Sequence, residues 1–215
     1  MYRGIIFDMD GVLADTESYY TNRRDEYLRL MGYQRQENTD FTGSNEKALW
    51  ETMVPNDPEL RQELLMGYRA YRKLHPIPFR ELLDPQAAPL FRTLKERGLK
   101  IGIASSSDPK AIAALVQAAG VEALVDSQIS GDQCKAHKPD PEIYLRSLKA
   151  LGLTAGEALA VEDSPTGILS AKRAGLTVLA LRPRHDEPLD QSAADTVISQ
   201  LMDVVSYIQN EKERA

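Results

Sequence analysis

The sequence predicts an α/β protein with a doubly wound parallel sheet and a small α-helical insertion. Short apolar runs, each the length of a buried strand, alternate along the chain with helix-like stretches that end at glycine. This alternation is typical of parallel strands joined by helical crossovers. Residues 16–83 interrupt it, because they hold helix-like segments and no convincing strand. We expect the ligand site at the carboxyl ends of the strands, where open α/β sheets bind their ligands.

The individual elements carry start and stop signals. The expected strands are apolar runs at residues 5–7, 101–104, 159–161 and 178–181. The expected helices, each followed by a glycine that can form a left-handed C-terminal cap, are at residues 91–97, 111–119, 143–151 and 168–174. Asp108 and Asp140 each precede a proline, so both are expected to be N-caps with the proline at the first helical position.

The interruption predicts a cap made of helices near residues 18–31, 45–53 and 57–74. We expect a cap domain over residues 16–82, inserted into a core domain formed by residues 1–15 and 83–215. The return to the core is marked by a group of helix-breaking residues suited to a hinge, namely Pro76, Pro78, Asp84 and Pro85. A lid of helices over the sheet is the simplest arrangement of these parts.

Composition argues against several kinds of partner. The 215 residues are 42% hydrophobic and 27% charged, as in ordinary globular proteins, and the net charge is −6. An acidic chain offers no broad positive field, so neither nucleic acid nor a membrane surface is expected as a partner. No apolar run reaches membrane-spanning length, and the first residues suit the fold rather than a secretory signal. We expect a cytoplasmic monomer whose single cysteine, Cys134, excludes an intrachain disulfide.

The sharpest local signal is Asp8-Met9-Asp10-Gly11, directly after the first expected strand. Residues two apart in an extended chain project to the same side, so the carboxylates of Asp8 and Asp10 should share one crevice. Such a pair can divide labour, since one carboxylate can attack an electrophile while the other moves a proton. Gly11 permits a sharp turn away from the sheet. Taken alone, the pair can also be two solvated loop acids.

Two further patterns suit phosphate. Ser105, Ser106 and Ser107 follow the second expected strand and precede a helix, so hydroxyl and backbone N–H groups point at one spot. Lys138 lies on a turn stiffened by Pro139 and Pro141, where a fixed ammonium can neutralise phosphate oxygens. In isolation, such serines are more often helix caps and such a lysine is more often an ordinary surface residue.

Glu162 and Asp163 follow the third expected strand, which places adjacent carboxylates at another strand end. Hard oxygen ligands suit Mg²⁺, although acids here can also complement the dipole of the following helix. Zinc is not expected, because the three histidines lack ligand spacing. All four patterns fall at the same edge of one predicted sheet, which chance placement would rarely produce.

These motifs resemble those of the haloacid dehalogenase-like superfamily, most closely its phosphatase and β-phosphoglucomutase-like branch with a helical cap. The resemblance covers nearly the whole chain. Its motifs are residues 7–17 (Phe-Asp-Met-Asp-Gly-Val-Leu-Ala-Asp-Thr-Glu), residues 103–107 (Ile-Ala-Ser-Ser-Ser), Lys138-Pro139 and residues 161–167 (Val-Glu-Asp-Ser-Pro-Thr-Gly). It implies a Rossmann-like core and a magnesium-dependent enzyme that hydrolyses phosphate monoesters.

The resemblance also implies a role for each matched residue. Asp8 is expected to be the nucleophile and a Mg²⁺ ligand, and Asp10 the general acid and base, with its backbone carbonyl on the metal. Glu162 and Asp163 complete the metal site. The residues expected to hold the phosphoryl group are Ser105, Ser106 and Lys138, with Gly11 beside them. True dehalogenases of the superfamily lack the second aspartate, so Asp10 favours phosphoryl transfer.

Within the cap the match is weaker. Mutase-type members carry a histidine where this chain has Tyr19-Tyr20, and an arginine near residues 43–44, where it continues Asn-Glu-Lys at residues 45–47. Lysine cannot supply the planar, two-pronged grip of arginine on phosphate. We therefore predict hydrolysis of a small phosphate ester, with a phosphosugar mutase and a non-catalytic phosphate-binding module as alternatives. The cap residues expected to contact the substrate are Tyr20, Lys47 and Arg72.

Overall fold

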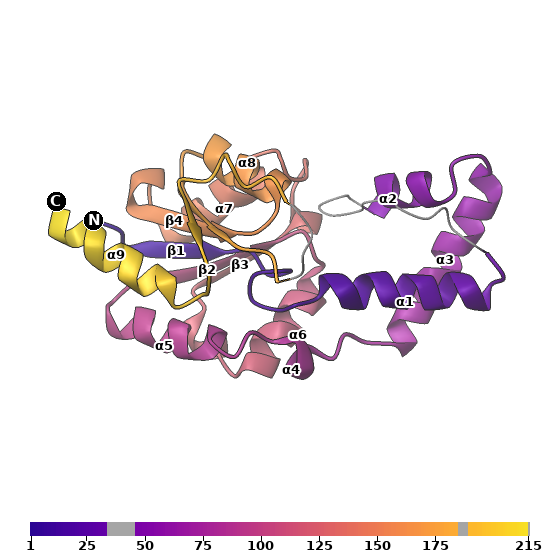
Figure 1. Ribbon diagram of the computed structural model, residues 1–215, viewed down its shortest axis with the longest axis horizontal. Helices are drawn as coiled ribbons and strands as arrows, with labels where there is room; N and C mark the ends of the chain where they lie inside the picture. Colours follow the sequence, from indigo (N-terminus) through magenta and orange to yellow (C-terminus); the bar gives the residue numbers. More distant parts are fainter. Residues whose placement is uncertain (34–45, 185–188, 215) are drawn as a thin grey trace. The chain divides into compact units, whose positions relative to one another are not determined.

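A six-stranded parallel sheet forms the centre of the fold in the computed structural model, which describes residues 1–33, 46–184 and 189–214, with backbone alone at 46–48 and 212–214. The strands lie in the order β3-β2-β1-β4-β5-β6 (Figure 1). Their bounds are β1 Gly4–Phe7, β2 Lys100–Ser105, β3 Ser127–Ser130, β4 Ala158–Glu162, β5 Thr177–Leu181 and β6 Thr196–Ile198. Since β1 pairs with β2 on one side and with β4 on the other, Ile5 lies beside both Ile101 and Leu159. The three strands that carry the aspartate, serine and glutamate motifs are therefore neighbours.

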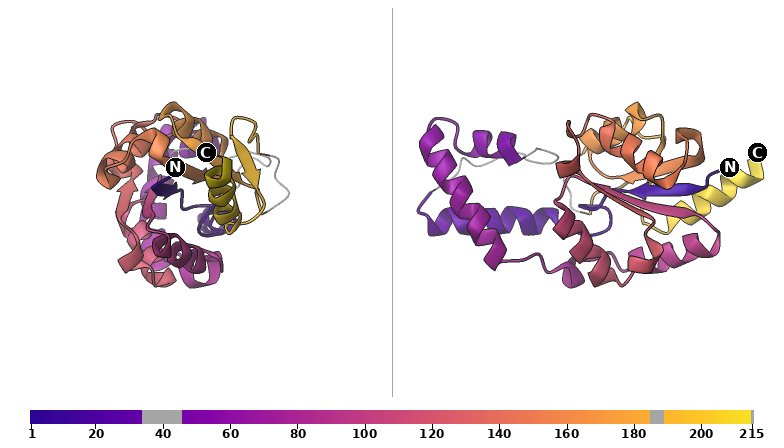
Figure 2. Two further views of the ribbon diagram at one scale, coloured as in Figure 1. Left: turned by 90° about the vertical axis from the view of Figure 1, so that its left-hand side faces the viewer. Right: turned by 180° about the vertical axis from the view of Figure 1, so that it is seen from behind.

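Helices cover both faces of this sheet, as Figures 1 and 2 show. One face carries α5 (Ala87–Glu96), α6 (Pro109–Ala119) and α9 (Asp203–Arg214), and the other carries α7 (Glu142–Leu151) and α8 (Pro165–Arg173). Short helical turns complete the unit at α4 (Phe79–Leu82), η1 (Glu122–Leu124), η2 (Gly131–Gln133) and η3 (Ala155–Glu157). Every residue of β1 is buried, as expected for a parallel strand covered on both faces. The predicted fold class is confirmed.

Several helix ends follow the signals in the sequence. Asp108 caps α6, because its carboxylate accepts hydrogen bonds from the backbone N–H groups of Lys110 and Ala111. Gly120 and Gly152 adopt the left-handed conformation directly after α6 and α7. The local capping chemistry therefore determines where these helices begin and end.

Other boundaries differ from the prediction. Asp140 is not the N-cap of α7, because Pro141 occupies that position and the Asp140 carboxylate accepts from the N–H of Glu142 in a local turn. The expected strands did not include β3 or β6. Both are short edge strands that are only partly buried, so neither shows the apolar run that marks a central strand.

The insertion is a compact unit of its own. The chain divides into Thr16–Pro78 and a second unit formed by Met1–Asp15 with Phe79–Ala215. The helices of the inserted unit are α1 (Glu17–Leu30), α2 (Glu46–Met53) and α3 (Pro58–Leu74). They bury a separate apolar cluster that includes Trp50 and Tyr68. None of the described helices in either unit has the length and apolar character needed to cross a membrane.

Two passages of chain in the core unit are tied together next to the insertion points. The N–H of Asp15 donates to the carbonyl of Leu82 at 2.8 Å, and the N–H of Asp84 donates to the carbonyl of Leu13 at 2.9 Å. The guanidinium of Arg184 donates to the Asp84 carboxylate at 2.6 Å. These contacts hold the loop that follows β1 against the chain that returns to α5.

Replacing Asp108 by alanine should lower the free energy of unfolding by about 1 kcal/mol, because two N–H groups of α6 lose their acceptor. Chemical denaturation measures the change. Lys110→Ala, an exposed substitution in the first turn of the same helix, is the matched control and should change stability by less than about 0.5 kcal/mol. Wild-type stability in Asp108→Ala would contradict the cap.

Candidate active site

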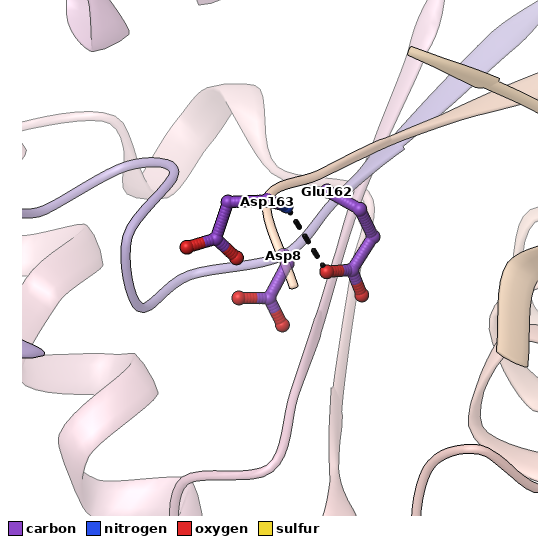
Figure 3. A group of neighbouring side chains, drawn as sticks. All are labelled: Asp8, Glu162 and Asp163. Atoms are coloured by element: carbon purple, nitrogen blue, oxygen red, sulfur yellow. Dashed lines mark hydrogen bonds between the residues drawn. The ribbon is translucent and has the colours of Figure 1, made fainter. Parts of the chain in front are cut away.

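The predicted motifs meet at the carboxyl end of the sheet. Asp8 follows β1, Ser105 ends β2, and Glu162 ends β4 with Asp163 next in the chain. Figure 3 shows the carboxylates of Asp8, Glu162 and Asp163 gathered at the strand ends. All three residues are buried, and one oxygen from each lies within 4.8 Å of the others. Adjacent parallel strands therefore deliver three acids to one point.

Lys138 joins two of these carboxylates. Its ammonium donates to Asp8 Oδ1 at 2.5 Å, to Glu162 Oε1 at 2.6 Å and to the carbonyl of Ala104 at 3.2 Å. The lysine side chain is only 6% exposed, and that of Glu162 is fully buried. Buried charges are costly unless they are paired and hydrogen-bonded. The lysine expected to meet phosphate is therefore also the counter-ion of the acidic cluster.

The cluster shifts the pKa values of its members. Burial raises the pKa of Asp8 to about 8 against the opposing effect of Lys138, and the charges of Glu162 and Asp10 add to the rise. Burial alone would lower the pKa of the Lys138 ammonium, but the carboxylates of Asp8 and Glu162 together raise it above its ordinary value. Lys138 is therefore a permanent cation at neutral pH.

The donor set fits a divalent metal ion. Asp8, Glu162 and Asp163 offer carboxylate oxygens, which are the ligands that Mg²⁺ prefers. When ionised, these three carboxylates outnumber the single ammonium of Lys138, so a cation would balance the remaining negative charge. Oε1 of Glu162 is directed to Lys138 and to Tyr144, which donates to it at 2.5 Å. Glu162 therefore orients the lysine as well as belonging to the group of potential metal ligands.

Asp10 faces the serine loop that follows β2. Its Oδ2 accepts from Ser107 Oγ at 2.7 Å and from Ser105 Oγ at 3.3 Å. Ser105 Oγ in turn accepts from the N–H of Ser107 at 3.0 Å, and Ser130 Oγ on β3 donates to the carbonyl of Ser107 at 2.7 Å. Ser106 lies between the two and is exposed. The structure thus brings the second aspartate and the serine loop together.

Two glycines allow backbone to approach the acidic cluster closely. Gly11 has a φ of 79°, and a Cβ there would lie 1.9 Å from Oδ2 of Asp163. A Cβ on Gly167 in α8 would lie 2.1 Å from Oε2 of Glu162. A side chain at either position would force the neighbouring carboxylate to move. Gly11, expected to permit a turn beside the substrate, therefore makes that turn and also leaves space for Asp163.

Two residues at the site, Tyr144 and Gln191, are absent from the predicted set, and Ser107 has a partner that the serine pattern does not predict. Ser107 was part of the serine pattern, but its bond to Asp10 was not foreseen. Tyr144 lies in the predicted helix at residues 143–151. The spacing of apolar residues there predicts which face of the helix is buried, but not which residues that face contacts. Burial raises the pKa of Tyr144 well above its ordinary value, and the charge of Glu162 adds to the rise, so its hydroxyl is a neutral donor. Gln191, which follows no motif, donates to the carbonyl of Asp163 at 2.7 Å.

The predicted cap residues belong to the other unit. Tyr20 lies on α1, with its ring 5.6 Å from the guanidinium carbon of Arg23, and Arg72 lies on α3. Lys47 belongs to α2, but its side chain, like residues 43–45, is outside the described part of the chain. Their contact with a substrate stays a prediction.

Family membership follows from the arrangement and from known proteins together. A family model described as haloacid dehalogenase-like hydrolase matches residues 2–175, a span that contains the aspartate, serine, lysine and glutamate motifs. The chain belongs to the haloacid dehalogenase-like hydrolase family. The resemblance drawn from the motifs is thereby confirmed.

Relatives of this hydrolase include named phosphatases. It is 30% identical to Validoxylamine A 7'-phosphate phosphatase of Streptomyces hygroscopicus subsp. limoneus, over 95% of this chain and 96% of that protein. It is also 30% identical to Phosphorylated carbohydrates phosphatase of Thermotoga maritima, over 80% of this chain and 81% of that protein. The crystal structure of CbbY from Rhodobacter sphaeroides in complex with phosphate matches with a TM-score of 0.72 at 26% identity, covering 93% of this chain and 95% of that chain. The similarity therefore extends through the insertion as well as the core.

Replacing Gly11 by alanine should destabilise this hydrolase more than Gly98→Ala does. Both glycines have positive φ, 79° and 75°, so alanine strains the backbone by about 1–2 kcal/mol at either position. A Cβ at Gly98 meets nothing within 4 Å, whereas a Cβ at Gly11 collides with Asp163. The difference between the two losses, measured by chemical denaturation, reports the collision. Equal losses would contradict the close packing.

Proposed function

We propose that this hydrolase is a magnesium-dependent phosphatase that removes phosphate from a small phosphorylated metabolite, with Asp8 as a transiently phosphorylated nucleophile. The observation that carries the proposal is the buried ammonium of Lys138 between Asp8 and Glu162. A fixed cation beside a carboxylate nucleophile suits an anionic substrate, because it offsets the repulsion between the two anions. The named phosphatases among the relatives support the same assignment.

The proposed reaction has two displacement steps. A carboxylate oxygen of Asp8 attacks the phosphorus, the bond from phosphorus to the ester oxygen breaks, and Asp10 gives its proton to the leaving oxygen. Water then attacks the phosphorus of phosphorylated Asp8, Asp10 takes a proton from that water, and inorganic phosphate leaves with the Asp8 carboxylate restored. The hydrogen bonds of Ser105 and Ser107 keep Asp10 at the end of β2, where it can serve both steps. Proton transfer by a positioned group contributes about 10²–10⁴ in rate.

Asp8, Glu162 and Asp163, with the backbone carbonyl of Asp10, are the residues that would hold Mg²⁺. When bound, the ion polarises the phosphoryl oxygens and favours the ionised form of Asp8. The chain itself contributes Lys138, which stays cationic, and the serine loop, whose hydroxyl and N–H groups can hold phosphoryl oxygens. Ser105, Ser106 and Lys138 are the proposed phosphate ligands, with Gly11 beside them.

We further propose that the insertion, residues 16–82, is a cap that selects the substrate. The side chains at the strand ends can recognise only phosphate, so the rest of the substrate must be recognised elsewhere, and closure over it strengthens the electrostatic contacts. Tyr20, Lys47 and Arg72 are the proposed contacts. A net charge of −6 favours a small ester over a polyanion. A monomer acting in the cytoplasm remains the proposed working form.

A phosphosugar mutase is the alternative. A mutase must protect phosphorylated Asp8 from water until a sugar returns, which requires a cap that closes tightly on a second phosphate. The arginine and histidine of mutase-type members are missing from the sequence at their expected positions. Each lost charge-assisted contact removes about 1.5–3 kcal/mol from such closure. Hydrolysis is therefore favoured. A non-catalytic phosphate-binding module is disfavoured, because it needs neither the Asp8 nucleophile nor Asp10.

Replacing Asp8 by asparagine should abolish magnesium-dependent phosphate release, because an amide is isosteric with a carboxylate but far less nucleophilic. Release is measured on a panel of small phosphate esters, with and without a chelator. Asp132→Asn, which changes an exposed aspartate in η2, is the matched control and should keep full activity. Retained turnover in Asp8→Asn would exclude Asp8 as the nucleophile.

Hydrolase and mutase differ in their products. With a hexose 1-phosphate as substrate, phosphorus NMR should show inorganic phosphate and little hexose 6-phosphate, both with and without an added hexose bisphosphate. The reason is that water reaches phosphorylated Asp8 before a sugar returns when no two-pronged clamp holds a second phosphate. If isomerised sugar phosphate forms faster than free phosphate, the hydrolase proposal is wrong and the mutase alternative is supported.

A further inference from the structure

Tyr144 touches both charged neighbours of the proposed nucleophile. Its hydroxyl donates to Glu162 Oε1 at 2.5 Å, and its ring centroid lies 5.2 Å from the ammonium nitrogen of Lys138. The tyrosine is fully buried. One side chain therefore contacts the carboxylate with its polar end and the ammonium with its aromatic face, which attracts cations.

Glu162 is held from several sides. Its Oε1 accepts from Lys138 as well as from Tyr144, and its Oε2 accepts from the N–H of Asp163 at 3.3 Å. The backbone of Gly167 lies so close to the carboxylate that a Cβ there would be 2.1 Å from Oε2. The carboxylate thus has little freedom to turn, and it presents Oε1 to the lysine.

We propose that Tyr144 is a positioning residue for the phosphatase reaction, holding Glu162 so that the ammonium of Lys138 stays beside Asp8. The inference rests on the proposed function, because it concerns the cation that would meet the phosphoryl group. Among the contacts of the described residues, Tyr144 makes no hydrogen bond to Asp8 and does not touch the serine loop.

The hydroxyl is the part of Tyr144 that packing does not explain. The ring belongs to the apolar cluster between α7, α8 and the sheet, and phenylalanine would fill that space equally well. Without the hydroxyl, Lys138 would be the remaining donor on Oε1 among the described residues. The full attraction of that oxygen would then act on the ammonium and draw it toward Glu162, away from Asp8.

The first test is Tyr144→Phe, assayed with the ester that the wild-type protein hydrolyses best. We expect kcat/KM to fall about tenfold or more, the size of effect that loss of a charge-assisted hydrogen bond produces. Tyr2→Phe is the matched control, because it removes a hydroxyl that donates to Thr177 Oγ1 at 2.9 Å, away from the acidic cluster, and it should keep wild-type activity. Circular dichroism confirms folding, and 4-aminophenylalanine incorporated at position 144 restores a donor on the same ring and should recover most of the loss.

The second test separates positioning from general loosening of the core. The affinity for inorganic phosphate in the presence of Mg²⁺ is measured by calorimetry for wild type, Tyr144→Phe, Lys138→Met and the double variant. Tyr144→Phe should weaken phosphate binding severalfold in the wild-type background and by less than about twofold when Lys138 is already methionine, since coupled residues are not additive. Equal effects in both backgrounds would overturn the proposal.

The two proposals fail in different ways. If the wild-type protein hydrolyses none of the esters, the phosphatase assignment fails, and the phosphate-affinity cycle still decides whether Tyr144 acts through Lys138. If the wild-type protein is active and Tyr144→Phe matches it in kcat/KM, the phosphatase assignment stands and the positioning role is wrong.

Discussion

The buried ion pair of Lys138 with Asp8 and Glu162 is the interaction on which the rest of the site depends. Removing charges from water costs several kcal/mol for each ion, and their mutual attraction compensates only when geometry and hydrogen bonding are good. Here the ammonium lies 2.5 Å from one carboxylate oxygen and 2.6 Å from the other. Such a pair is weak evidence for stability, and perturbed buried charges gather at functional sites. Its presence is therefore better explained by chemistry than by folding.

The order of the strands, one turn and two glycines bring the members of that ion pair together and make room for them. The order β2-β1-β4 places the Asp8 and Glu162 strand ends next to each other, and the turn before α7 brings Lys138 between them. The same segment continues into α7, so it also supplies the Tyr144 hydroxyl to the same oxygen of Glu162. One turn and one helix thus provide both donors on a single carboxylate oxygen. Backbone at Gly11 and Gly167 can then pack directly against the acids, because neither residue has a side chain.

The two units bury separate apolar clusters, one between the sheet and its helices and one among α1, α2 and α3. The acidic cluster and the serine loop belong wholly to the unit that contains the sheet. Under the proposed function, changes in the insertion can therefore alter substrate recognition without disturbing the groups proposed to act on phosphate. This separation is consistent with relatives named for different phosphorylated compounds that match along most of the chain.

Local patterns in the sequence determined much of this structure. Apolar runs marked the central strands, and the caps at Asp108, Gly120 and Gly152 marked helix ends, because period and capping depend on neighbouring residues alone. Parallel strands align their carboxyl ends, so the sequence also indicated that Asp8 and Glu162 would share one edge. The edge strands β3 and β6 were not predicted, because partly buried strands need no apolar run.

Tertiary structure alone decided which groups pair. Lys138 and Asp8 are 130 residues apart, and nothing local selects Glu162 rather than Asp163 as the lysine's second partner. The same holds for the hydroxyl of Tyr144 on Glu162, since a helical period shows which face is buried but not what the face meets. Such pairings depend on strand order, on rotamers and on the close approach of backbone, and these are set only when the whole sheet assembles.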